Sequence, residues 1–244
     1  TSLAAAMELY EIGAVTKNDT DGIALNFGNA EALCKLAELT GIGKGFGKEI
    51  GLGAMRLCEK YGHPKLAMVV KGQEFPGYDV RAMQGMALAY ATSNRGACHM
   101  RASPFSDDFS HIRHAGKAKI VKKSQDKNAA IDSTGCCAFA GNAWDIEDYA
   151  AQIHGACKGV WDGKRLLKVG ERIFNLERLF NEKAGMTKND DTLPDRMLNE
   201  KAQSGAGKGQ VAQLDKMLPE YYQLRGWDKN GKVSKKIQKD LNLT

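Results

Sequence analysis

The apolar residues of this chain recur at the spacing of α-helices along most of its length. Near the start, Leu3, Ala6, Met7 and Tyr10 stand at i, i+3, i+4 and i+7, which puts them on one face of a helix that ends near Gly13. The sequence therefore predicts a mainly α, multihelical fold. We expect helices over about residues 3–13, 29–41, 48–61, 80–94, 145–158, 162–184 and 211–225.

The helix expected over residues 162–184 carries the longest apolar stripe of the chain. Because its apolar residues follow helical spacing, we expect them to face the core and to need no functional explanation. They are Leu166, Leu167, Val169, Ile173, Leu176 and Phe180.

Two segments depart from helical spacing. The apolar run from Leu66 to Val70, followed by a turn, is the one expected strand and marks a domain joint. Residues 100–130 are polar, basic and poorly periodic, and we expect a long loop there with one short strand at residues 118–122. The sequence thus predicts two domains, residues 1–70 and residues 71–244.

Positive charge gathers in two places. The chain has a formal net charge of +6, with six basic residues against one aspartate in residues 113–127 and five lysines against two aspartates after Gly226. No aromatic residues interleave with the basic ones in either segment, and no recognition motif accompanies them, so we expect no binding of nucleic acid. Two alternatives stay open, namely solvated surfaces and a docking patch for an acidic protein partner.

Neither a membrane span nor a signal peptide is expected. The sequence has no apolar stretch of about 18 residues, and the segment Thr1 to Glu8 has no basic region before it turns acidic. Its 43% hydrophobic and 26% charged content is that of a soluble globular protein. We therefore expect a cytoplasmic protein. The first residue is not Met, which fits a chain cut at a structural joint, N-terminal processing or an expression product.

The six cysteines do not form a disulfide pattern, because two of them are adjacent and the other four are scattered. We expect reduced thiols, one or two of which bind a metal. Cys34, Cys58 and Cys157 lie at core positions or at a helix end, so we expect them to be small buried side chains.

Two further candidate sites are not supported by their spacing. The glycine-rich segment Gly41 to Gly47 satisfies neither nucleotide-binding pattern, and we expect a bend into a helix. No cysteine or carboxylate stands at zinc-site spacing from His63, His111, His114 or His154, so we expect no structural zinc.

The segment from Ala91 to Arg101 combines an apolar helix end with chemically active residues. Arg95, Cys98, His99 and Arg101 follow one another within seven positions. The segment could simply be where a buried helix reaches the surface. Alternatively, the His99 imidazole at the mouth of a tightly packed helix is well placed for proton transfer near neutral pH.

The segment from Ile131 to Phe139 has the composition of a tight turn. It offers a carboxylate at Asp132, small residues, Gly135 and then two thiols, so it could bring backbone and sulfur close to a ligand. A [4Fe–4S] cluster needs about four ligands. If one thiol of this turn binds such a cluster, the other ligands must lie outside this chain.

Together these two segments resemble the aldehyde ferredoxin oxidoreductase family, the tungsten–pterin enzymes. The resemblance covers nearly the whole chain in order and corresponds to the C-terminal two-fifths of such an enzyme. It implies the second part of the middle domain, partial here over residues 1–70, and the helical C-terminal domain over residues 71–244. The matching stretches are Ala6–Glu11, Phe75–Asp79, Ala91–His99, Asp132–Cys137 and Arg172–Arg178.

The resemblance implies a tungsten-bis-pterin cofactor (tungstopterin, of the molybdopterin type) and a [4Fe–4S] cluster close to it. Asp132 would hydrogen-bond pterin nitrogens, and Gly135 and Cys136 would offer backbone groups. Cys137, five positions after Asp132, would be the fourth ligand of the iron–sulfur cluster.

His99 resembles the histidine near the metal, with a role in proton transfer or substrate orientation, and Arg101 would neutralise the phosphates of the cofactor. The N-terminal pterin-binding domain of the family, its cluster motif with three cysteines and its first Asp-x-x-Gly turn have no counterpart in this sequence. The adjacent Cys136 and Cys137 also depart from the expected pattern.

The resemblance implies oxidation of an aldehyde to a carboxylic acid, with electron transfer to ferredoxin and a possible homodimer. This chain alone, without the N-terminal domain, would be inactive. Two alternatives stay open. One is the tungsten subunit of a related enzyme such as a benzoyl-CoA reductase, and the other is a cofactor-free helical domain with a binding or structural role.

Overall fold

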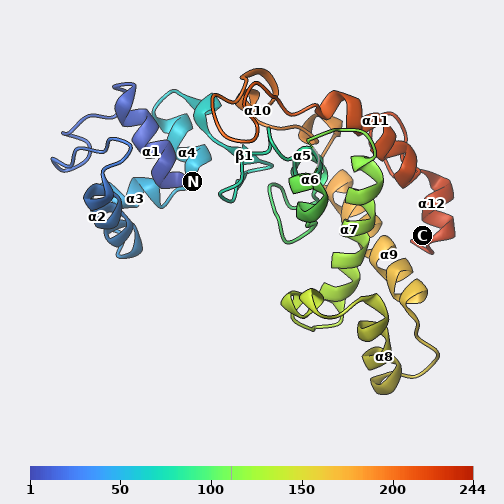
Figure 1. The fold of residues 1–244 in the computed structure, drawn as a ribbon. Helices are drawn as coiled ribbons and strands as arrows, with labels where there is room; N and C mark the ends of the chain where they lie inside the picture. The colour runs from blue at the N-terminus through green and yellow to red at the C-terminus, as the bar shows by residue number, and fades with distance from the viewer. Residues whose placement is uncertain (111, 244) are drawn as a thin grey trace. The chain divides into compact units, whose positions relative to one another are not determined.

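A computed structural model describes residues 1–110 and 112–243 (Figure 1), so what was expected of His111 lies outside the described residues. The chain forms two compact units, each assembled from segments distant in the sequence. The first consists of residues 1–78, 95–97 and 193–200, and the second of residues 79–94, 98–192 and 201–244.

The first unit is a small helical cluster around a leucine-rich core. Leu9, Leu25, Leu36 and Leu57 are fully buried in it. Burying each such side chain stabilises the fold by about 1.5–3 kcal/mol. Its elements are α1 Ser2–Glu11, α2 Ala30–Gly41, α3 Gly47–Ile50, α4 Ala54–Lys60, β1 Val69–Val70, β2 Gln73–Glu74 and α10 Asp195–Asn199.

A short antiparallel pair of strands, β1 and β2, joins the parts of this unit. The pair is held in register by Val69 opposite Glu74. The Glu74 carboxylate accepts hydrogen bonds from the Ser2 hydroxyl at 2.6 Å and from the Ala54 backbone N–H at 2.7 Å. One carboxylate therefore holds the N-termini of α1 and α4, where backbone N–H groups have no helical partner.

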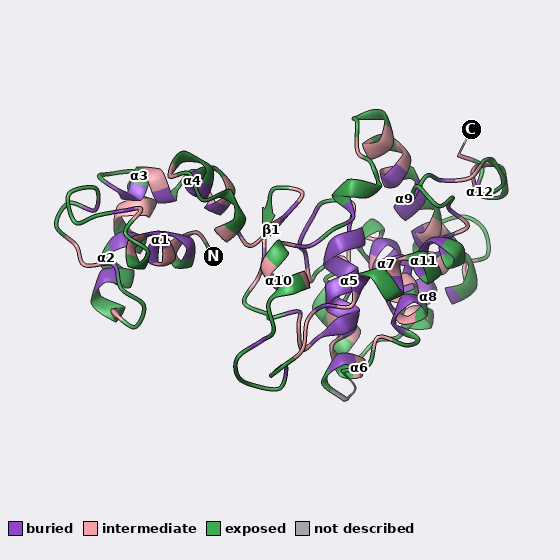
Figure 2. Cartoon of the chain, turned by 90° about the horizontal axis from the view of Figure 1, so that it is seen from above, coloured by how far each residue is buried: buried purple, intermediate pink, exposed green. Residues whose placement is uncertain are grey.

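The second unit is an assembly of helices around α5, which is buried along its whole length (Figure 2). The abundance of Gly, Ala and Met in α5 lets neighbours approach it from several sides. The elements of this unit are α5 Gln84–Thr92, α6 Phe105–Ser110, α7 Lys117–Ser133, α8 Ile146–Ala156, α9 Gly163–Lys183, α11 Leu214–Arg225 and α12 Lys235–Asp240.

The N-terminus of α5 is capped by a carboxylate from α6. Asp108 accepts hydrogen bonds from the backbone N–H groups of Gly85 at 2.8 Å and Met86 at 2.7 Å. Its charge is balanced by the buried Lys117 ammonium at 2.8 Å. An anion at this end of a helix also interacts favourably with the helix dipole.

Helices α7 and α9 run antiparallel in close contact (Figure 1). A Cβ atom at Gly170 of α9 would lie 1.8 Å from the carbonyl oxygen of Asp126 on α7. Glycine is therefore required where the two backbones cross. Near the crossing, Lys122 of α7 forms an ion pair with Glu171 of α9 at 2.8 Å.

Buried polar side chains connect α5, α7 and α11. The Arg225 guanidinium is fully buried, pairs with Asp126 and donates to Gln125 at 2.8 Å. Gln125 in turn donates to the Thr92 hydroxyl at 3.0 Å and accepts from the Tyr221 hydroxyl at 2.6 Å. Because each of these groups has a partner, the network avoids the cost of an unpaired buried charge.

The prediction of a mainly helical fold is confirmed, but the loop expected over residues 100–130 is wrong, as is the strand at 118–122. The structure has α6 and the 17-residue helix α7 in this region. Its buried face includes Lys117, Gln125 and Asp126, polar residues that helical apolar spacing does not detect. Their burial is possible because partners from α6 and α11 satisfy them.

Three smaller predictions also fail. Cys34 and Cys157 are exposed, and only Cys58 of the three is buried. The helix expected over residues 48–61 is interrupted between α3 and α4, where Gly53 has a φ of +89°. The apolar stripe of α9 is only partly buried, since Leu176 and Phe180 are exposed while Phe174 and Arg178 face the core.

Helix α12, in the basic tail, was not predicted. Ser234 begins it by accepting a hydrogen bond from the Ile237 backbone N–H at 3.3 Å. Within the described ranges, no helix is long and apolar enough to cross a membrane.

Candidate functional site

The C-terminal end of α7 and the turn after it form the base of the candidate site. Asp132 lies in the last turn of α7 with an exposed carboxylate. The hydroxyls of Ser133 and Thr134 each donate to a carbonyl oxygen one turn earlier, both at 2.7 Å. Gly135 then takes a φ of +76°, a left-handed conformation that glycine adopts without steric cost. The predicted tight turn is present, and a helix leads into it.

The segment from His99 to Ser103 lies along α7 in the opposite direction and is hydrogen-bonded to it. The Ser124 hydroxyl accepts from the Ser103 backbone N–H at 2.9 Å, and the Asn128 side-chain amide donates to the Met100 carbonyl oxygen at 2.9 Å. One turn further along α7, Asp132 accepts from Arg101. We call the segment 99–103 the strap.

Arg101 and Asp132, two predicted cofactor-binding residues, form an ion pair with 3.1 Å between Nη1 and Oδ2. Their side chains are 28% and 40% exposed, so water screens the attraction and the pair adds about 0–1 kcal/mol to stability. Its main consequence is geometric, because it holds a guanidinium beside a carboxylate at the end of α7. A cationic and an anionic hydrogen-bonding group thus face solvent together.

His99 begins the strap and is half-buried. Its backbone carbonyl oxygen accepts a hydrogen bond from the Ser103 hydroxyl at 3.0 Å, and the preceding Cys98 is buried. The strap therefore brings His99 and Arg101 to the helix that carries Asp132, although 31 positions separate Arg101 from Asp132 in the sequence.

The two adjacent cysteines differ in their surroundings. Cys136 is partly buried against the small apolar cluster that contains Ile131 and Tyr149, and its backbone N–H donates to the Thr134 hydroxyl at 3.1 Å. Cys137 is exposed and its thiol is free. Of the two, Cys137 is the thiol that an external ligand can reach.

Tyr149 of α8 forms a hydrogen bond to the backbone of this turn. Its hydroxyl donates to the Cys137 carbonyl oxygen at 3.3 Å. Burial raises the pKa of Tyr149, and the neighbouring Cys136 and Cys137 thiols raise it further. Tyr149 thus acts as a neutral donor that fixes the backbone of Cys137.

Two residues that hold the strap on α7, Ser124 and Asn128, were not singled out in the sequence. Ser124, Asn128 and Asp132 stand four positions apart, a polar row on one face of α7. That spacing is a helix signal in polar residues rather than apolar ones. It could have indicated the helix α7, though not the segment that lies along it.

In the part of the chain that the structure describes, no three His, Cys, Asp or Glu side chains gather closely enough to hold a metal ion. The donor set offered here is one exposed thiol, one carboxylate and one guanidinium. This set could form part of the binding surface of a larger cofactor with anionic groups, and its single thiol is fewer than the roughly four thiolates that an iron–sulfur cluster takes.

Comparison with known proteins identifies the family. The family model described as aldehyde ferredoxin oxidoreductase, domains 2 and 3, matches residues 1–243. The chain belongs to the aldehyde ferredoxin oxidoreductase family. It is 40% identical over 252 aligned positions to the tungsten-containing aldehyde ferredoxin oxidoreductase of Pyrococcus furiosus, and 38% identical to that of Thermococcus kodakarensis. The alignments cover 99% of this chain and 42% of each relative.

A solved structure shows the same fold in another enzyme of different sequence. The active-site complex of benzoyl coenzyme A reductase, bound to a dienoyl coenzyme A, matches with a TM-score of 0.75 at 18% identity. The match covers 99% of this chain and 43% of that chain. The predictions of family and of mainly helical fold are thereby confirmed. The boundary near residues 70 and 71 and the roles of the individual site residues stay predictions.

Proposed function

We propose that this chain is the C-terminal part of a tungsten–pterin oxidoreductase that converts aldehydes to carboxylic acids. The observation that carries the proposal is the strap, which joins His99 and Arg101 to the end of α7 beside the Asp132–Cys137 turn. Membership of the family supports the reaction class. The part of the full-length protein that precedes this chain would supply the remaining cofactor ligands, so the 244-residue chain alone would be inactive.

The residues of this chain fit one side of such a cofactor. Asp132 would accept hydrogen bonds from pterin N–H groups, with Gly135 and Cys136 offering backbone N–H donors. Arg101 would balance the negative charge of the cofactor phosphates. Cys137, exposed and free, would be the single cluster ligand from this chain.

Oxidation of an aldehyde by water releases two electrons and two protons for each carboxylic acid formed. The bound tungsten cofactor would supply the two-electron chemistry, and the [4Fe–4S] cluster the route for electrons to ferredoxin. The role left to this chain is to orient the substrate, hold the cofactor and move a proton. His99, half-buried at the start of the strap, is the residue we assign to the proton.

Elemental analysis of the full-length protein tests the proposal. We expect about one tungsten and about four irons per protein, the latter from the stoichiometry of a [4Fe–4S] cluster. Metal-free full-length protein would instead favour a helical domain with a binding or structural role. The matched pair Cys137→Ala and Cys136→Ala then tests the ligand: only Cys137→Ala should lower the iron content. Native iron in the Cys137→Ala protein would overturn this assignment.

The similarity in fold to benzoyl coenzyme A reductase suggests a second candidate function. Because that likeness extends to the fold alone, activity must decide between the two. We expect the metal-loaded protein to reduce a viologen dye when an aldehyde is added. Dye oxidation driven by an aromatic acyl-coenzyme A, without any aldehyde activity, would favour the second function.

A further inference from the structure

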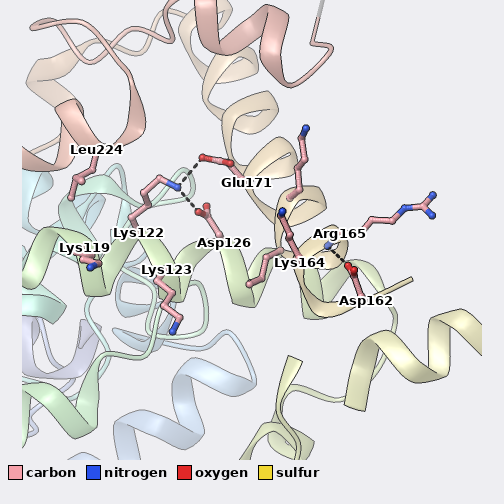
Figure 3. A pocket seen from close by; sticks show the side chains of 11 residues that line it. Lys119, Lys122, Lys123, Asp126, Asp162, Lys164, Arg165, Glu171 and Leu224 are labelled. Atoms are coloured by element: carbon pink, nitrogen blue, oxygen red, sulfur yellow. Dashed lines mark hydrogen bonds and ion pairs between the residues drawn. The ribbon is translucent and has the colours of Figure 1, made fainter. Parts of the chain in front are cut away.

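A groove of about 850 Å³ lies between α7 and α9, on the second unit. Figure 3 shows lysine side chains around it and two ion pairs near its centre. Its apolar surface is provided in part by Leu167 and Leu224. No aromatic side chain is among its described lining residues.

The carboxylates of the groove already have ion-pair or hydrogen-bond partners within the chain. Asp126 pairs with the buried Arg225 and with Lys122, the latter at 2.9 Å. Lys122 also pairs with Glu171 at 2.8 Å. Asp162 accepts a hydrogen bond from a backbone N–H at 2.7 Å as the N-cap of α9. These acidic groups therefore leave the remaining cations of the groove without neutralisation.

Four lysines of the groove have exposed side chains and no ion-pair or hydrogen-bond partner within residues 1–110 and 112–243. They stand as two pairs, each spaced i, i+4, with one pair on α7 and one on α9. Residues at this spacing lie on the same face of a helix, one turn apart. We name them the groove lysines: Lys119, Lys123, Lys164 and Lys168.

Like charges at i, i+4 destabilise a helix, so fold stability gives no reason for this arrangement. The two pairs line the same groove, one pair on each helix, and Leu167 and Leu224 add apolar surface to it. Carboxylates on a partner chain could bind both pairs while its apolar atoms cover the leucine side chains.

We propose that this groove is a docking surface for an acidic segment of a partner protein. An acidic protein segment and a nucleic acid would both complement the charge of the groove. The protein segment is favoured because the groove combines its lysines with leucine side chains and has no described aromatic face on which a base could stack. The inference is independent of the proposed tungsten chemistry, since it rests on α7, α9 and their lysines alone.

A fluorescently labelled octaglutamate peptide is the probe, and the full-length protein that contains this chain is the target. We expect fluorescence anisotropy to show binding that weakens as salt is raised, because ion pairing at the surface is screened. Neutralising all four groove lysines to Gln should weaken binding at least tenfold. The matched control neutralises four exposed lysines of the tail: Lys232, Lys235, Lys236 and Lys239.

Both variants lose the same number of charges, so only position distinguishes them. An affinity of the tail variant within about twofold of that of the unmodified protein supports the groove. The tenfold loss expected for the groove variant corresponds to about 1.4 kcal/mol of binding free energy. Equal weakening in both variants, or no binding by the unmodified protein, overturns the proposal. Tighter binding of a single-stranded oligonucleotide that displaces the peptide overturns it in favour of nucleic acid. Matching thermal unfolding curves confirm that each variant is folded.

A second measurement locates the peptide on the unmodified protein. A carbodiimide links a carboxylate to a neighbouring lysine amine with loss of one water. Mass spectrometry should find these links on Lys119, Lys123, Lys164 or Lys168. Links confined to the lysines of the tail would contradict the groove even if the peptide binds.

Discussion

The guanidinium of Arg101 and the carboxylate of Asp132 lie 3.1 Å apart although 31 positions separate them in the sequence. Their pairing fixes the strap, residues 99–103, against the C-terminal end of α7. We expect Asp132→Asn to change the free energy of unfolding by less than about 1 kcal/mol, because the pair is partly exposed. In the full-length protein the same change should lower tungsten retention at least about tenfold, as expected for a lost cofactor contact.

Urea unfolding and metal analysis of the same sample check this prediction. Asp240→Asn, at an exposed position of α12, is the matched control and should retain the metal. If Asp132→Asn retains tungsten fully, Asp132 has no role in cofactor binding.

The strap should become more mobile when its contact with Ser124 is removed. The Ser124 hydroxyl is the acceptor for the backbone N–H of Ser103, and a typical hydrogen bond contributes about 0.5–1.5 kcal/mol. Ser124→Ala should therefore speed hydrogen exchange at the Ser103 amide. Ser133→Ala removes a hydroxyl that bonds only within α7 and should leave that amide unchanged. Equal exchange in both variants would show that the strap is held by other contacts.

Gly170→Ala tests the close crossing of α7 and α9. The added Cβ would lie 1.8 Å from the Asp126 carbonyl oxygen, so the helices must separate. We expect a loss of about 3 kcal/mol or more, at the upper end of overpacking costs. Gly155→Ala in α8 meets nothing within 4 Å and should instead stabilise the protein by about 0.5–1 kcal/mol. Denaturant midpoints measure both, and a neutral Gly170→Ala would mean that the helices separate easily.

Cys58 should make stability fall at high pH. Burial raises the pKa of this thiol from 9.0 to about 11. Below pH 9 the thiol is protonated in both states. Above pH 9 the unfolded chain loses the proton while the folded protein keeps it, so the free energy of unfolding falls until about pH 11, by up to about 3 kcal/mol.

The difference between the unmodified protein and Cys58→Ala isolates this contribution from other groups that titrate in the same range. The unmodified protein should lose more stability than the variant between pH 9 and pH 11. Parallel pH profiles for the two proteins would contradict the prediction.

Apolar spacing predicted the helices whose buried side chains are apolar, such as α1 and α2. It failed on α7, because Gln125 and Asp126 are buried by partners from α5 and α11 that lie far away in the sequence. In α9 it found the helix and the buried Leu166, but not the rest of the inner face. That face continues with Gly170, Phe174 and Arg178, where a glycine and an arginine take positions that apolar spacing assigns to other residues.

The candidate site was predicted in its parts but not in its assembly. His99 and the Asp132–Cys137 turn stand out because reactive side chains follow one another at short spacing. Nothing in either segment shows that they meet. Their contact depends on Ser124 and Asn128, whose row on α7 has meaning only once a strap lies across it.

The strap also bears on where its conformational entropy is lost. The ion pair of Arg101 with Asp132 joins two residues of the second unit. Under the proposed function, this side of the cofactor surface would be built by contacts within one unit, so the entropy of ordering the strap would be lost in the folding of that unit rather than in cofactor binding.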